Sequence, residues 1–110
     1  MAIFITQGRF TQDAVRGMIA KPEDRAEAVA RLFARSGGKL LSYYMTFGEY
    51  DFLVVSEGPY EGMAVTAIVV AAGGGVTDLK TTLALSSSEM KDAFAKAGPI
   101  ASGFRSAGAK

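Results

Sequence analysis

The fold of this chain is decided by residues 40–57, LLSYYMTFGEYDFLVVSE. Two runs rich in aromatic and β-branched residues, 40–47 and 50–57, flank Gly48 and Glu49. Runs of this composition on either side of a short glycine-containing connection are typical of a β-hairpin. The stretch therefore predicts two antiparallel strands joined by a tight turn.

On the N-terminal side of this hairpin, the sequence predicts one strand and two helical segments. Residues 3–5, Ile-Phe-Ile, form a compact apolar run that predicts the first strand. Thr11 is placed to cap a short helical turn. Pro22 suits the first position of a longer helix, because its fixed φ is helical and its missing N–H would have no partner there. That helix is expected to end at Gly37 and Gly38.

On the C-terminal side, a helix is predicted over residues 59–72 and a fourth strand over residues 76–85. Ser86 and Glu89 have the spacing of a capping box, which predicts a short helix ending at about residue 97. No helix or strand is predicted after that residue.

The element order β-α-β-β-α-β is typical of the ferredoxin-like α+β fold, in which two helices lie on one face of a four-stranded antiparallel sheet. We expect residues 1–97 to form this single domain. Residues 98–110 are mostly small and show no periodicity, so we expect them to be a flexible C-terminal tail.

Apolar residues occupy successive positions in three of the predicted strands, as in Ile3, Phe4 and Ile5. A sheet with one solvated face would instead alternate apolar and polar residues. Both faces are therefore expected to be buried, and the two helices can cover only one. We expect an identical subunit to cover the other, giving a homodimer or higher oligomer. The alternative is that the C-terminal helix, residues 87–97, folds back over that face.

Composition excludes several classes of function. The 12 Lys and Arg residues nearly balance the 11 Asp and Glu residues, so no charge excess draws the chain towards nucleic acid or an anionic membrane. The absence of Cys and His removes thiolate and imidazole chemistry, and we expect no metal site and no cofactor. No stretch has the pattern of a signal peptide or a membrane span, so we expect a cytoplasmic protein.

Residues 46–51, Thr-Phe-Gly-Glu-Tyr-Asp, resemble the signature of the GYD family, which takes its name from a Gly-x-Tyr-Asp element at this hairpin. The chain is similar to that family also at residues 21–26, 38–40 and 80–82, so the resemblance covers residues 3–94. It implies a dimeric α+β barrel, in agreement with the two-faced strands. The family has no established biochemical activity, so the resemblance implies no catalytic residues.

The same hairpin, with Gly75, Val76 and residues 80–82 after it, is similar to the effector-binding domain of Lrp/AsnC-class transcription regulators. In that class the Gly-x-Tyr-Asp loop lies near the place where an amino acid binds between subunits. The resemblance implies a ligand-sensing module. Because the first strand begins at the N-terminus, we expect a stand-alone module that does not bind DNA directly.

The candidate ligand-binding residues lie on and around the hairpin and on the fourth strand: Tyr43, Tyr44, Gly48, Tyr50, Asp51 and Lys80. Each also has an ordinary structural role. Gly48 supplies the positive φ of a tight turn, and the tyrosines are typical of a core or interface with a polar rim. Asp51 can accept hydrogen bonds from the hairpin's own backbone, or it can orient an amino or hydroxyl group of a ligand at a subunit interface.

Three functions stay open on sequence alone. The first is a homo-oligomeric module that holds a small apolar or amphipathic metabolite beside the sheet. The second is a cofactor-free enzyme of the oxygenase or isomerase type, in which Asp51 and Lys80 are the candidate acid and base because His is absent. The third is a purely structural protein, whose apolar sheet faces serve only assembly.

Overall fold

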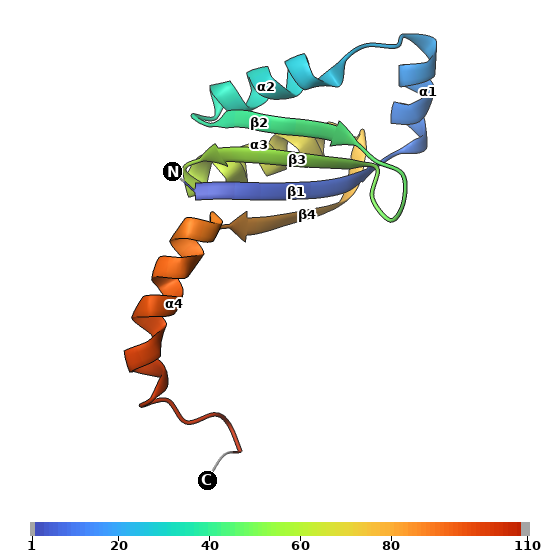
Figure 1. Cartoon of the computed structure of the whole chain (residues 1–110). Coiled ribbons are helices and arrows are strands. Elements are labelled where there is room, and N and C mark those ends of the chain that lie inside the picture. Colours follow the sequence, from blue (N-terminus) through green and yellow to red (C-terminus); the bar gives the residue numbers. More distant parts are fainter. Residues whose placement is uncertain (1, 109–110) are drawn as a thin grey trace.

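Four antiparallel strands form one sheet in the computed structural model, which describes residues 2–108 (Figure 1). The strands are β1 (Ala2–Phe10), β2 (Lys39–Met45), β3 (Phe52–Gly58) and β4 (Val76–Ala84), and they lie in the order β2-β3-β1-β4. β1 is central, because Ile3 lies opposite Glu57 of β3 on one side and Ala84 of β4 on the other. This order confirms the predicted ferredoxin-like fold.

Two helices, α2 (Arg25–Arg35) and α3 (Tyr60–Ala72), pack on one face of the sheet, as predicted (Figure 1). α2 begins later than Pro22 suggested: the carboxylate of Asp24 accepts a 2.9 Å hydrogen bond from the N–H of Ala26 and caps the helix. Pro59 is the residue just before α3. The two prolines therefore indicated the helices but not their first residues.

A further helix, α1 (Gln12–Ala20), connects β1 to α2 and extends the predicted helical turn. The Thr11 hydroxyl caps it by accepting a 3.2 Å hydrogen bond from the N–H of Ala14. Thr11 also donates hydrogen bonds to the carbonyls of Gly74 and Gly75, just before β4. None of the residues of α1 is buried, so this helix is held to the domain mainly through its N-terminal end.

The core lies between the helices and the sheet. Its buried side chains are at most 9% exposed: Phe4, Phe33, Phe52, Val54 and Met63. Alternate residues of β1 and β3 point to this side. The intervening residues point to the opposite face, which α2 and α3 leave uncovered; we call it the open face, and its central apolar residues are Ile3, Ile5, Leu53 and Val55.

The connection between β2 and β3 is longer than the predicted tight turn and comprises residues 46–51. The N–H of Thr46 donates to the carbonyl of Asp51 (2.8 Å), and its hydroxyl donates to the carbonyl of Tyr50 (2.7 Å). Gly48 has the predicted positive φ, 146°. The expectation that Tyr50 and Asp51 belong to the strand was wrong, because β3 begins at Phe52 and the carbonyls of both residues accept the hydrogen bonds from Thr46 that close the loop.

The last helix, α4 (Ser87–Ala101), follows β4 and points away from the sheet (Figure 1). The predicted capping box is present, with Ser86 and Glu89 exchanging hydrogen bonds of 3.0 and 3.1 Å. The helix ends at Ala101 instead of about residue 97, and none of its residues is buried. It therefore leaves the open face of its own chain uncovered. The radius of gyration, 18.0 Å, accordingly exceeds the value of about 13 Å typical of a compact chain of this length.

The sequence also predicted where the domain ends and that a flexible tail follows it. The boundary of the domain at residue 97 and the flexibility of residues 98–110 stay predictions, and positions 109 and 110 of that tail lie outside the described residues. Within residues 2–108, no helix is long and apolar enough to cross a membrane.

Candidate functional site

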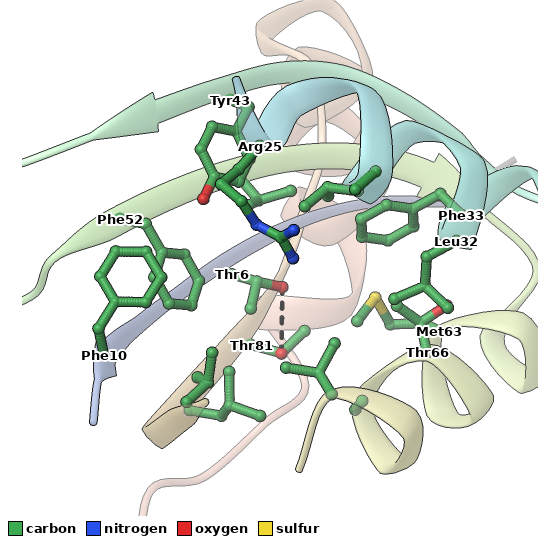
Figure 2. A pocket seen from close by; sticks show the side chains of 17 residues that line it. Thr6, Phe10, Arg25, Leu32, Phe33, Tyr43, Phe52, Met63, Thr66 and Thr81 are labelled. Carbon is green, nitrogen blue, oxygen red and sulfur yellow. Dashed lines mark hydrogen bonds between the residues drawn. The ribbon is translucent and has the colours of Figure 1, made fainter. Parts of the chain in front are cut away.

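A cavity of about 140 Å³ lies between the sheet and the helices α2 and α3 (Figure 2). We call it the inner cavity. Part of its wall is made of small side chains, which do not fill the space. These are Ala28 on α2, Ala67 on α3, and Thr6 and Thr81 of the sheet. The rest of the wall is mostly apolar and includes Phe10, Val29, Phe33, Phe52, Val54, Met63 and Leu79.

Polar groups reach the wall of the inner cavity at a few points. The hydroxyls of Thr6 and Thr81, on neighbouring strands, lie 3.2 Å apart and share a hydrogen bond. Arg25, the first residue of α2, extends its guanidinium between Tyr43 and this threonine pair in the view of Figure 2. Its side chain is 39% exposed, which places it at the mouth of the cavity. Such a wall suits a molecule with an apolar body and one polar end.

Two other hydroxyls near the cavity belong to the packing of the domain. Thr66 lines the inner cavity, but its hydroxyl donates a 2.9 Å hydrogen bond to Ser36, at the end of α2. Ser56 is 1% exposed, and its hydroxyl has no partner in the described part of the chain. The space beside it measures about 10 Å³, which is the size of one water molecule and not of a ligand.

Tyr43 is a predicted site residue that does line the inner cavity. Its ring stacks on Phe52, with the two ring centroids 6.4 Å apart. Burial raises the pKa of its hydroxyl above the ordinary value of 10.0, while Arg25 opposes that shift and Asp24 adds to it. At neutral pH the hydroxyl is therefore protonated, and it can donate a hydrogen bond but cannot act as a base.

Tyr44 and Lys80 lie on the open face, on the two edge strands of the sheet. Tyr44 is opposite Leu53, Leu53 is opposite Gln7, and Gln7 is opposite Lys80. Three strand spacings, about 14 Å, therefore separate Tyr44 from Lys80. The structure does not bring these two residues together with Tyr43 within one chain.

The sequence suggested that the Asp51 carboxylate bonds the backbone of its own hairpin, but it bonds the backbone of β1 instead. The carboxylate accepts a 2.9 Å hydrogen bond from the N–H of Phe10, and the N–H of Asp51 donates to the carbonyl of Gly8 (2.8 Å). These bonds extend the contact of β1 with the hairpin beyond the last ladder pair, Gly8 with Phe52. The Asp51 carboxylate is thus already engaged.

Gly48 and Tyr50 lie in the same loop and do not line the inner cavity. The guanidinium carbon of Arg9 is 5.9 Å from the centroid of the Tyr50 ring, within the range of a cation–π interaction. A Cβ atom at Gly48 would meet nothing within 4 Å. The role of this loop within the chain is therefore backbone geometry, and no side chain of it reaches the cavity.

The enzyme hypothesis depended on Asp51 and Lys80, and neither residue lines the inner cavity. The structure therefore places no candidate acid or base of that pair beside the space where a substrate would fit. Among residues 2–108, no cluster of three or more acidic, His or Cys side chains could hold a metal ion.

Arg25 is the charged residue at the cavity that sequence reasoning missed. Polar residues were considered on the strands, whereas Arg25 opens α2 directly after its Asp24 cap. A signal was available, since a cation in the first turn of a helix opposes the helix dipole.

Comparisons with known proteins agree with the fold. A family model described as GYD domain matches residues 4–94. The transcriptional regulator NMB0573 of Neisseria meningitidis, solved in complex with L-Met, is 18% identical with a TM-score of 0.52, and the match covers 78% of this chain and 51% of the regulator. This chain thus spans about half the length of that protein, and the likeness shows the fold alone.

Two other solved structures are similar at lower scores. FFRP-DM1 is 15% identical with a TM-score of 0.46, over 77% of this chain and 100% of the other. TTHA0845 from Thermus thermophilus is 17% identical with a TM-score of 0.43, over 79% of this chain and 96% of the other. No curated protein matches the sequence.

Proposed function

This chain belongs to the GYD domain family, and we propose that it is a homo-oligomeric module that binds a small apolar or amphipathic metabolite. The inner cavity is the observation that carries this proposal. An engineered interior cavity of about 150 Å³ binds benzene. A space of about 140 Å³ therefore has room for an aromatic ring or a branched aliphatic group.

The wall of the cavity supplies both affinity and orientation. Its apolar side chains remove the ligand's apolar surface from water, which stabilises a complex by about 25 cal/mol per Å². The hydroxyls of Thr6, Thr81 and Tyr43, with the Arg25 guanidinium at the mouth, are the polar groups that the cavity offers to a ligand. The candidate residues on the hairpin loop and on the open face have no part in this cavity, so we assign them to the fold or to assembly.

The open face supports the homo-oligomeric part of the proposal. Its centre is apolar, with Ile3 and Ile5 on β1 beside Leu53 and Val55 on β3. α4 points away from it (Figure 1). A second copy presents the same face, so an isologous contact buries both apolar surfaces at once.

Thermal unfolding against a library of amino acids and small organic acids tests ligand binding. Amino acids are included because the Neisseria regulator is solved with L-Met. A true ligand raises the melting temperature in a concentration-dependent way. Ala67→Leu should abolish the rise by filling the inner cavity, whereas Ala64→Leu, at an exposed position of the same helix, should keep it.

A flat response across the whole library counts against ligand binding. If the wild-type chain nonetheless forms a stable oligomer in sedimentation equilibrium, the structural alternative gains. A response that survives Ala67→Leu unchanged would place the ligand outside the inner cavity.

A further inference from the structure

A second hollow adjoins the inner cavity on its outer side. It measures about 250 Å³ and lies among α1, the segment 21–25 and the start of β4. We call it the outer hollow. Phe10, Arg25 and Val76 line both spaces, so the two spaces adjoin at these three residues.

The two spaces differ in charge. The inner cavity receives a single charged group, Arg25, at its mouth. The outer hollow is lined by Lys21, Glu23 and Arg25, and so carries a net positive charge. The neighbouring carboxylate of Asp24 accepts the hydrogen bond from Ala26 that caps α2, and it does not line the outer hollow.

Arg25 has free N–H donors where the inner cavity adjoins the outer hollow. Its Nη1 group donates a hydrogen bond to the carboxylate of Glu23 at 2.7 Å. A guanidinium carries five N–H donors in a planar fork, so the groups on Nε and Nη2 can still bind an anion. Lys21 has no ion pair within residues 2–108.

We infer that the outer hollow binds the anionic head of the ligand whose apolar body occupies the inner cavity. The ligand class is a small monocarboxylate in which a short chain joins the carboxylate to an aromatic or branched apolar group. Arg25 is the residue that selects the anion. This inference rests on the proposed function, since it identifies the kind of molecule that the cavity takes.

Ligands of one shape but with different head groups should interact differently with the charges of the outer hollow. A carboxylate gains charge-assisted hydrogen bonds from Arg25 and attraction from Lys21. A neutral alcohol of the same shape keeps only the apolar contacts and weak hydrogen bonds. An amine meets two cations against the single carboxylate of Glu23, so it is repelled on balance. Affinity should therefore fall in the order carboxylate, alcohol, amine.

Three matched probes test this order: 3-phenylpropanoate, 3-phenylpropan-1-ol and 3-phenylpropylamine, titrated calorimetrically into the full chain at low salt. We expect the carboxylate to bind about tenfold more tightly than the alcohol, a moderate effect because Arg25 is partly exposed. Raising the salt concentration should weaken the carboxylate alone.

Variants of the boundary residues sharpen the test. Arg25→Met should lower the affinity for the carboxylate to about that for the alcohol, while the affinity for the alcohol changes much less and reports an intact cavity. Arg25→Lys should restore part of the preference. Glu23→Gln removes the competing carboxylate and should strengthen carboxylate binding about threefold.

Equal affinity for the carboxylate and the alcohol overturns the inference. If both are then lost in Ala67→Leu, the binding module itself still stands. Equal weakening of both probes in Arg25→Met would mean that Arg25 is structural, which also refutes anion selection. Failure of all three probes to bind refutes this ligand class, and the library experiment then decides separately whether the cavity binds anything.

Discussion

The two faces of the sheet are built from the same strands but are completed in different ways. On the side of α2 and α3, Phe4 and Val54 are 6% and 4% exposed. On the open face, the next residues along each strand, Ile5 and Val55, are only partly covered. Both faces are apolar at their centres, so hydrophobicity alone does not distinguish them. The difference teaches that one chain completes one core and, under our proposal, shares the second with another copy.

The largest expected effect comes from placing a charge on each face in turn. Phe4→Lys buries an unpaired ammonium in the core, which costs several kcal/mol and should leave the chain unfolded. Ile5→Lys places the same charge on the open face and should yield a folded but dissociated chain. Circular dichroism with sedimentation equilibrium separates these outcomes. A wild-type chain that is a folded monomer at micromolar concentration would contradict the shared second core.

An intermediate effect is expected at the close contact between α2 and α3, the two helices that cover one face of the sheet. A Cβ atom at Gly62 of α3 would collide with the carbonyl oxygen of Ser36, at the end of α2. Gly62→Ala should therefore destabilise the domain by about 1–3 kcal/mol. Gly17→Ala is the matched control, because a Cβ atom there meets nothing within 4 Å and the exposed α1 should gain up to about 1 kcal/mol. Urea unfolding of both variants measures the difference, and equal effects would contradict the tight contact.

The smallest expected effect concerns pH and compares two adjacent tyrosines on opposite faces. Burial raises the pKa of Tyr43, so its hydroxyl ionises at lower pH in the unfolded chain than in the folded one. This contribution to stability is fully present below about pH 10 and is lost as the pH rises through the folded-state pKa. Tyr43→Phe should therefore lose less stability above that pH than the wild type does.

The control for this prediction is Tyr44→Phe, which removes the hydroxyl of a residue that is 62% exposed on the open face. Urea unfolding across the alkaline range, with all three proteins at one ionic strength, provides the measurement. An identical alkaline decline in wild type and Tyr43→Phe would show that burial at the cavity wall does not matter for Tyr43.

Much of the fold could be predicted because its signals are local. Apolar residues in succession at Ile3, Phe4 and Ile5 indicated a strand between two apolar layers, and the structure places Phe4 in the core with its neighbours on the open face. The capping box of Ser86 and Glu89 could also be predicted, because both partners lie within one helical turn. The order of elements then limited the topology to one common arrangement.

The site was harder to predict because it depends on contacts between distant segments. The bond from Asp51 to Phe10 joins residues far apart in the sequence, and no local pattern indicates it. Tyr43 and Tyr44 were treated as equivalent, although alternation along β2 sends them to opposite faces. Arg25 reaches the cavity only because α2 crosses the sheet at that point, and this is a property of the assembled fold.

The central position of β1 has a consequence for how the chain is made. The strand ends at Phe10, yet its partner β4 ends at Ala84, 74 residues later. At ribosomal speeds of about 5–20 residues per second, β1 is complete roughly 4–15 s before its second neighbour exists. The β2–β3 hairpin closes locally and much sooner. During synthesis, the central strand of the sheet is therefore the one that stays longest without its full set of hydrogen-bonding partners.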